Sequence, residues 1–325
     1  MRALVTGAGG FIGSHLVDAL LDAGHEVRAL VRYNGRGSWG HLDDRPVQPL
    51  EQLTVRLGDV TDGSFVRELV DGCDVVFHLA ALIGIPYSYH APASYVATNV
   101  QGTLNILEAC RASRVGRVIV TSTSEVYGTA RYTPIDEAHP LQAQSPYAAS
   151  KIAADKLAES YFCAFDLPVV TLRPFNTYGP RQSARAVIPT VLTQALGGAA
   201  EIRLGNLTPE RDLTYVEDTA RAFVLAADAP GIEGQVIHFG NGVAFSVREI
   251  AERCVRAAQL DTRVVSVQER QRPERSEVDL LLCDPTRATR LLGWAPRVTL
   301  DEGLRRTADY LRARLDRYRP ADYVI

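Results

Sequence analysis

The sequence lacks the features that mark a disulfide-rich, metal-binding or nucleic-acid-binding protein. Its 325 residues include five widely separated cysteines, with no Cys-x-x-Cys pair and no clustering with the seven histidines: Cys73, Cys110, Cys163, Cys254 and Cys283. We therefore expect buried or half-buried free thiols and no metal site. The net charge is −3, and acids and bases are mixed along the chain. This distribution disfavours nucleic acid and an anionic membrane as partners.

Long apolar runs are also missing. The longest, Val75 to Tyr87, is interrupted by His78 and is too short to span a bilayer. The first residues, 1–6, enter a strand pattern directly and have no apolar signal-peptide core. We expect a cytoplasmic protein. With 46% hydrophobic residues the chain can bury a large core, and we favour two lobes.

Short β-branched runs alternate with longer amphipathic runs over the first 175 residues. This alternation is typical of βαβ units and predicts an α/β fold with a doubly wound parallel sheet of the Rossmann type. The predicted strands are Ala3–Thr6, Val27–Val31, Thr54–Leu57, Val75–Leu79, Arg117–Thr121 and Val169–Leu172, and the predicted helices are Phe11–Ala23, Ser64–Val70, Ala93–Ala112 and Pro146–Phe165.

After Pro174 the alternation decays. We expect one further strand at Gln235–Phe239 and helices near Val247–Gln259 and Leu300–Arg314. The prediction is a Rossmann domain over residues 1–173, to which the chain returns over about 213–240. Residues 174–212 and 241–325 would form a smaller substrate-binding lobe.

A glycine loop lies between the first predicted strand and helix, in the sequence TGAGGFIG. Gly7 permits a tight turn, Gly10 lets the backbone approach a pyrophosphate, and Gly13 lets the helix pack closely. The phosphates would lie at the helix N-terminus, at Phe11 and Ile12. Glycines also collect in ordinary turns, but this placement favours a bound nicotinamide dinucleotide.

The choice of dinucleotide depends on the residues that follow the other strands. The second strand ends at Val31-Arg32, where NAD-binding chains often carry an acid. Arg32 could pair with a 2′-phosphate or stack on adenine; we favour NADP over NAD. Asp59 and Val60 are placed to contact the adenine. The sequence Leu79-Ala80-Ala81 would line the cofactor cleft, whereas His78 is better explained as a hydrogen-bonded core histidine.

The sequence SPYAASK places a tyrosine and a lysine on one face of a helix. Ser145 and Pro146 are typical of a helix start, and a spacing of four brings Tyr147 close to Lys151. A nearby ammonium would lower the pKa of the phenol and make it a general base for a secondary alcohol. Tyr and Lys at this spacing are common, so the pair gains weight only because the glycine loop precedes it.

Taken together, these motifs resemble those of the extended short-chain dehydrogenase/reductases, specifically the nucleotide-sugar epimerase/dehydratase family. The matching segments span nearly the whole chain: TGAGGFIG, NVQGT, TSTSEVYG, SPYAASK, RPFNTYGP and RDLTYVED. The resemblance implies that Thr123 bonds the sugar 4-hydroxyl, Tyr147 is the base, Lys151 holds the nicotinamide ribose and Asn99 lies in the cofactor site. It also implies a tightly bound, recycled cofactor and a homodimer formed through the helices of Asn99 and Tyr147.

Within this family, Glu125 of TSTSEVYG favours a 4,6-dehydratase of deoxysugar biosynthesis. After oxidation of C4, loss of water across C5 and C6 needs a carboxylate there, which an epimerase does not need. Many related dehydratases read Thr-Asp-Glu, but here the middle residue is Ser124, too weak an acid to protonate a leaving group. Glu125 could therefore act twice, with Ser124 or water as relay. A surface salt bridge is the alternative role for Glu125.

The segments closest to particular enzymes resemble GDP-mannose 4,6-dehydratase and the N-acetylhexosamine dehydratases of nonulosonic acid pathways. By this resemblance the substrate clamp would include Asn176, Arg181, Val187, Arg211 and Arg272, although any one arginine could be a solvated surface residue. The nucleotide base and the sugar stay open. The alternatives are a nucleotide-sugar 4-epimerase and a non-catalytic NAD(P)-sensing regulator.

Overall fold

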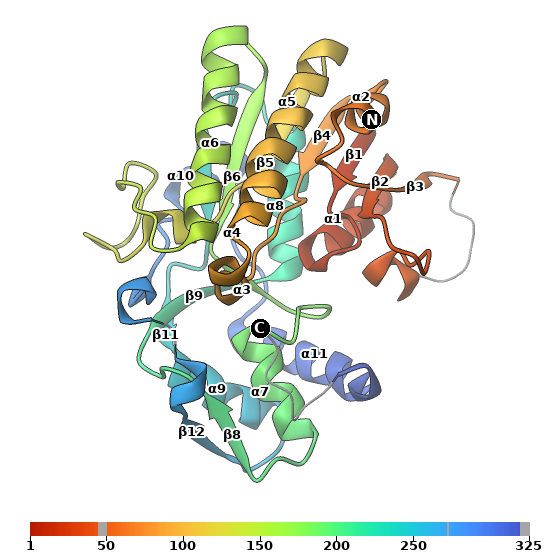
Figure 1. The fold of residues 1–325 in the computed structure, drawn as a ribbon. Helices are drawn as coiled ribbons and strands as arrows, with labels where there is room; N and C mark the ends of the chain where they lie inside the picture. The colour runs from red at the N-terminus through yellow and green to blue at the C-terminus, as the bar shows by residue number, and fades with distance from the viewer. Residues whose placement is uncertain (45–50, 272, 319–325) are drawn as a thin grey trace.

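A parallel sheet forms the centre of the larger part of the molecule (Figure 1). The computed structural model describes residues 1–44, 51–271 and 273–318. Within them the sheet has seven strands in the order β10-β6-β5-β4-β1-β2-β3, and all its neighbours run parallel. The strands are β1 (Arg2–Thr6), β2 (Glu26–Arg32), β3 (Leu53–Gly58), β4 (Val75–His78), β5 (Arg117–Thr121), β6 (Val169–Pro174) and β10 (Val236–Phe239). The predicted Rossmann-type fold class is confirmed.

Helices cover both faces of this sheet. Apolar residues of α1 (Phe11–Asp22), α8 (Val216–Asp228) and α10 (Thr286–Leu292) pack on one face, in a core that includes Leu16, Phe223 and Trp294. On the other face lie α2 (Gly63–Val70), α5 (Gly102–Ser113) and α6 (Pro146–Phe165). Figure 1 shows α5 and α6 side by side across that face.

The strand order of the large sheet reverses between β1 and β4. From β1 the chain proceeds outward through β2 and β3, and then it returns to the other side of β1 for β4, β5 and β6. Ligands of open parallel sheets bind where the order reverses in this way. The glycine loop follows β1 and therefore lies at this point.

A smaller group of elements packs around its own core, drawn below the sheet in Figure 1. It contains α7 (Val187–Leu196), β8 (Glu201–Leu204), β9 (Glu210–Tyr215), α9 (Val247–Ala257), β12 (Arg263–Ser266) and α11 (Leu300–Arg312), with the short strands β7 (Asn176–Tyr178), β11 (Ala244–Ser246) and β13 (Leu280–Leu281) beside β9. Short 3-10 turns are η1 (Gly40–Asp44), η3 (Ser124–Tyr127), η4 (Gln268–Arg270), η5 (Glu274–Ser276) and η6 (Leu315–Arg317). The predicted domain boundaries stay a proposal; α10, numbered within the second lobe, packs on the large sheet.

The predicted helix Ala93–Ala112 is helical along its whole length, but it is not a single α-helix. The chain forms α3 (Ile85–His90), α4 (Pro92–Tyr95), a π-helical turn η2 (Val96–Gln101) and then α5. Within the π-helical turn, the side chain of Asn99 accepts from Leu82 N at 2.8 Å and donates to Leu82 O at 2.9 Å. Such π-helical turns are frequent at functional sites.

Other elements escaped prediction. The helices α7 and α8 were not predicted, because the loss of alternation after Pro174 was the only signal used for that segment.

No helix in the described ranges is long and apolar enough to cross a membrane. All five cysteines are free thiols, but Cys163 is exposed, contrary to the expectation that all would be buried or half-buried.

Candidate active site

The glycine loop is shaped by backbone contacts that leave no room for side chains. Gly7 has a φ of +69°, and a Cβ there would lie 2.9 Å from Ala80 N. A Cβ on Gly13 would lie 2.2 Å from Gly7 O, so α1 packs directly on the loop. At Gly10 a Cβ would meet only Gly7 O, at 3.2 Å, which leaves that side of the loop open.

The N-terminus of α1 is suited to an anion. Gly10 occupies the N-cap position, no side chain caps the helix, and its first turn holds no acid. Backbone N–H groups at such an end bind phosphate well. Phe11 and Ile12 are half-buried at this turn. These observations fit the pyrophosphate of a nicotinamide dinucleotide.

The end of β2 carries a cation and an acid together. Arg32 is exposed, and its Nε lies 3.9 Å from Asp59 Oδ2 in an ion pair. The other oxygen of Asp59 accepts from Thr61 N and Oγ1, each at 2.9 Å. Next to Asp59, Val60 is buried. A 2′-phosphate at Arg32 would therefore meet a carboxylate as well as a guanidinium.

A directed hydrogen-bond chain builds the wall between β1 and β4. Leu79 N and Ala80 N both donate to Thr6 Oγ1 at 3.1 Å, and Thr6 Oγ1 lies 2.9 Å from His78 Nδ1. His78 Nε2 lies 3.0 Å from Thr103 Oγ1, whose hydroxyl donates to Asn99 O at 2.6 Å. His78 is thus a satisfied core histidine, as the sequence analysis favoured.

This chain also fixes the protonation of His78. Burial lowers the pKa of His78 to about 3, helped by the positive charge of Lys151, so its ring is neutral. Because the Thr103 hydroxyl donates its proton to Asn99 O, it accepts from the Nε2–H of His78. The Nδ1 of His78 then accepts from the Thr6 hydroxyl. The half-buried residues Leu79, Ala80 and Ala81 are held at the strand end by the same contacts.

Asn99 joins this wall to the helix of the predicted base. Besides its two bonds to Leu82, its Nδ2 donates to Ser150 Oγ at 2.9 Å, and Ser150 Oγ donates to Tyr147 O at 2.7 Å. Helix α6 begins as predicted, because Ser145 accepts from Ala148 N at 3.1 Å and Pro146 occupies the first turn.

Tyr147, Lys151 and Thr123 come together where α6 crosses the end of β5. The phenol of Tyr147 is hydrogen-bonded to the Thr123 side chain. Thr123 caps η3, where its Oγ1 accepts from Glu125 N at 3.2 Å. Lys151 is buried, and its Nζ donates to Thr121 O at 2.6 Å. The edge of the Tyr95 ring closes the other side, at 6.3 Å between ring centroids.

The expected lowering of the Tyr147 pKa by Lys151 is wrong for the protein alone. Burial raises the pKa of Tyr147, and the negative charges of Glu125 and Asp155 raise it further, whereas the Thr123 hydrogen bond lowers it. Burial in turn lowers the pKa of Lys151. The Lys151 ammonium donates to Thr121 O and not to the phenol. The Tyr147 phenol therefore needs further positive charge nearby to ionise.

Among the described residues, the carboxylate of Glu125 has no hydrogen-bond or ion-pair partner. It is half-buried on η3 and close enough to Tyr147 to affect its charge. Within the described ranges its carboxylate makes no hydrogen bond or ion pair, which counts against the salt-bridge alternative. Ser124 is buried, and its hydroxyl also bonds no described residue.

The predicted substrate clamp is only partly assembled. Asn176 Oδ1 is buried without a hydrogen-bond partner in the described part of the chain, as expected of a group that meets a ligand. Arg211 is buried on β9, 3.6 Å from Glu277, and Val187 begins α7. Arg181 instead pairs with Asp18 of α1 at 2.7 Å, so its guanidinium is not free for a diphosphate. Arg272 lies outside the described residues.

Sequence reasoning missed Arg185 as a site residue. A Cβ on Gly84 would lie 2.9 Å from Arg185 Nη1, and the positive charge of Arg185 acts on Tyr95, the neighbour of Tyr147. Its guanidinium bonds Ser183 Oγ at 3.3 Å and forms no ion pair with the described residues.

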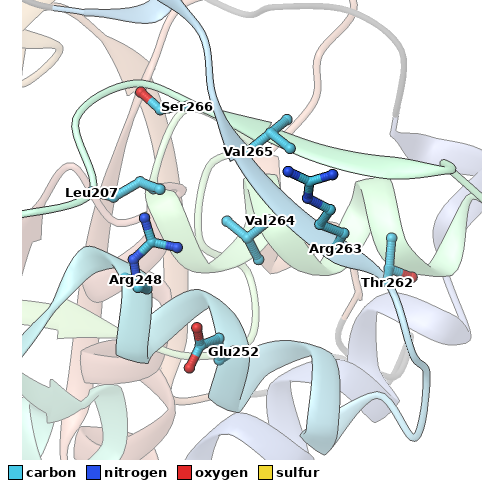
Figure 2. A pocket seen from close by; sticks show the side chains of 8 residues that line it. All are labelled: Leu207, Arg248, Glu252, Thr262, Arg263, Val264, Val265 and Ser266. Carbon is cyan, nitrogen blue, oxygen red and sulfur yellow. The ribbon is translucent and has the colours of Figure 1, made fainter.

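A separate cavity of about 560 Å³ lies in the smaller group of elements, between α9 and β12. Figure 2 shows Leu207 and Arg248 on one side of it and Val264 and Arg263 on the other. It contains none of the predicted site residues. The candidate active site is therefore defined by the strand ends and not by this cavity.

Comparisons with known proteins agree with this geometry. The family model of GDP-mannose 4,6 dehydratase matches residues 4–307. The chain is 35% identical to UDP-glucose 4-epimerase of Mycolicibacterium smegmatis, over 96% of this chain and 99% of that one. It is 34% identical to dTDP-glucose 4,6-dehydratase of Streptomyces niveus, over 96% and 93%. The solved dTDP-glucose 4,6-dehydratase of Streptomyces venezuelae, with NAD bound, superposes with a TM-score of 0.88 at 31% identity, covering 98% and 99%.

Proposed function

The chain belongs to the GDP-mannose 4,6-dehydratase family of nucleotide-sugar dehydratases and epimerases, and from that membership we propose that it is a nucleotide-sugar 4,6-dehydratase. Its substrate would be a hexose or N-acetylhexosamine linked to a nucleoside diphosphate. The product would be the 4-keto-6-deoxy sugar. The observation that carries this proposal is the carboxylate of Glu125 near Thr123 and Tyr147, which pairs with no residue in the described part of the chain.

The oxidation step falls to Tyr147. Its phenolate takes the proton of the sugar 4-hydroxyl, which Thr123 orients through a second hydrogen bond. A nicotinamide dinucleotide held at the glycine loop would accept the hydride from C4 and later return it to C6, and its positive charge would favour the phenolate. Lys151 adds its ammonium charge on the same helix face and holds the nicotinamide ribose.

The elimination step falls to Glu125. The ketone at C4 acidifies the C5 proton, and the Glu125 carboxylate takes it. As the C6–O6 bond breaks, that proton passes to O6, which leaves as water. When hydride is then returned to C6, C5 takes a proton that comes from solvent. Ser124 is buried and has no other partner among the described side chains, so its hydroxyl is free to relay the proton.

For the cofactor we propose NAD. The comparisons do not support the NADP preference expected from Arg32, because the S. venezuelae structure holds NAD. The Asp59 carboxylate beside Arg32 supports the same choice, since it would repel a 2′-phosphate. The predicted contact of Asp59 and Val60 with adenine stays a proposal.

A 4-epimerase is the second candidate. The M. smegmatis epimerase is as similar as the dehydratases, and Ser124 replaces the acid that many dehydratases carry. Product mass separates the two. The protein should be incubated with GDP-, UDP-, dTDP- and CDP-linked hexoses and N-acetylhexosamines. A product one water lighter supports the dehydratase, and a product of equal mass with inverted C4 supports the epimerase.

Two expectations from the sequence stay predictions. They are the homodimer through the helices of Asn99 and Tyr147 and the cytoplasmic location. The solution mass of the purified protein tests the first.

A further inference from the structure

Helix α6 meets three consecutive residues of the β5 end through three side chains spaced four apart. Tyr147 bonds the Thr123 side chain, and Lys151 Nζ donates to Thr121 O. Asp155, the next residue on the same face, accepts from Ser122 Oγ at 2.6 Å. The first two contacts belong to the proposed oxidation step, whereas Asp155 has no role in it so far.

Asp155 is also half of a buried ion pair. Arg173 of β6 donates to Asp155 Oδ2 at 2.7 Å and to Ser122 Oγ at 3.1 Å, and both charged side chains are at most 5% exposed. Behind Arg173, the Tyr127 hydroxyl bonds both this guanidinium and His238 Nε2. Asp155 Oδ1 has no hydrogen-bond partner in the described part of the chain.

We propose that Asp155 is a positioning residue for C4 oxidation, which holds the end of β5 in place beside Tyr147 through its contact with Ser122. Its negative charge also favours the charged form of Lys151. The positive charge of Arg173 opposes this second effect. The contact to Ser122 sets the register of Thr123, the next residue along the chain. The charge acts along the helix, one turn from Lys151.

The charged groups around Lys151 determine in which direction each substitution should move the pKa of Lys151 and of Tyr147. Asp155 on α6 raises the pKa of Lys151, whereas burial and Arg173 on β6 lower it. His78 on β4 is neutral, since burial lowers its pKa to about 3. Asp155 and Glu125 both raise the pKa of Tyr147. Removal of Asp155 should therefore lower the pKa of both Lys151 and Tyr147, and removal of Arg173 should raise that of Lys151.

This inference rests on the proposed function only through its first step. Oxidation at C4 begins both the dehydratase and the epimerase reaction, so the choice between them does not affect it. The rate of this step should rise with pH as Tyr147 loses its proton, which gives the acid limb of the pH profile. It should fall at higher pH as Lys151 loses its proton, which gives the alkaline limb. Asp155 and Arg173 then shift these limbs in predictable directions.

The test is the pH profile of nicotinamide reduction in the first turnover, followed by stopped-flow absorbance. The probe is whichever of dTDP-glucose, UDP-glucose, UDP-N-acetylglucosamine and GDP-mannose the wild-type enzyme converts. In Asp155→Asn both limbs should move down by about one pH unit, a tenfold loss of rate on the alkaline side. In Arg173→Gln the alkaline limb should move up. The control Glu159→Gln, on the exposed face of α6, should leave both limbs in place.

A purely structural role predicts lower rates with unmoved limbs, and that result in both variants would overturn the proposal. If the single variants do not fold, Asp155→Leu with Arg173→Met removes both charges together. Its alkaline limb should still move down, because Asp155 influences Lys151 more than Arg173 does. Ser122→Ala should lower the rate about tenfold without moving a limb, and full activity there would refute the positioning role.

If no sugar nucleotide is converted by the wild type, the proposed function fails while this inference can still be decided. Lys151 is proposed to hold the nicotinamide ribose, so NAD affinity should depend on its charge. As the pH is raised, calorimetry without sugar nucleotide should show NAD binding weaken. This weakening should begin at a lower pH in Asp155→Asn than in the wild type. An identical pH dependence in the two proteins would contradict the inference.

Discussion

The oxidation side of the candidate active site contains a continuous chain of hydrogen bonds, whereas the elimination side carries two polar side chains, Glu125 and Ser124, without a hydrogen-bond partner among the described residues. On the first side, Thr6, His78, Thr103 and Asn99 form one directed chain that continues through Ser150 to the Tyr147 backbone. On the second, the side-chain oxygens of Glu125 and Ser124 make no hydrogen bond to any described residue.

The difference follows from what each side has to do. Groups that position one hydride transfer gain from a fixed geometry, because every hydrogen bond reduces the freedom of the reacting atoms. A carboxylate that must take a proton from C5 and return it to O6 has to stay free for the substrate. The unpaired groups are therefore where members of this family with different outcomes should differ.

The largest expected effect is at the base. Tyr147→Phe removes the proposed acceptor of the 4-hydroxyl proton, so nicotinamide reduction should fall about 10³-fold or more while sugar nucleotide still binds. Tyr161→Phe is the matched control, because that hydroxyl lies on the same helix but bonds Glu108. Near-normal turnover in Tyr147→Phe would mean that another group is the base.

The next effect concerns the hydrogen-bonded side. Asn99→Ala leaves the N–H and C=O of Leu82 without their partner and removes one donor to Ser150 Oγ, and it should cost about 2–3 kcal/mol of unfolding free energy. Thermal unfolding measures this, and NAD affinity should fall with it. The control Asn206→Ala removes a backbone contact in a turn of the smaller group of elements. Equal destabilisation by the two variants would count against a special role for Asn99.

A smaller effect is expected on the elimination side. Ser124→Ala should slow product formation by about threefold, because a water can replace a relay hydroxyl. Nicotinamide reduction in the first turnover should not change. A loss of the oxidation step in this variant would show that Ser124 shapes the β5 end and is not a relay.

The smallest effect is at the cofactor rim. Protein stripped of dinucleotide should regain activity at lower NAD than NADP concentration, and Arg32→Ala should change either requirement by no more than about threefold, because Arg32 is exposed and its ion pair is long. Asp59→Asn should narrow the gap between the two cofactors. Tighter binding of NADP by the wild type would restore the preference first expected from Arg32.

The same contrast explains how far the sequence could be interpreted. The loop from Gly7 to Gly13 and the start of α6 at Ser145 were predictable, because each depends on neighbouring residues and on local backbone rules. The contacts of Asn99 in the π-helical turn were not, since its partner Leu82 is seventeen positions away. The ion pair between Arg181 and Asp18 escaped for the same reason, as its partners are 163 positions apart.

Burial limited the prediction in a second way. The spacing of Tyr147 and Lys151 was correctly read as one helix face, but the direction of the phenol pKa depends on how deeply the ring is buried. Likewise Asp155 was overlooked because nothing local marks it; its importance depends on Ser122 and Arg173 from two other strands.

The central claim is that Glu125 serves elimination and not oxidation, and Glu125→Gln tests it most directly. The substitution leaves Thr123, Tyr147 and Lys151 in place and removes only the charge. On mixing with a substrate of the wild type, the absorbance of reduced nicotinamide should rise and persist, without the 4-keto-6-deoxy product and with little solvent deuterium at C5. Elimination of water at the wild-type rate would contradict the account and place the base elsewhere.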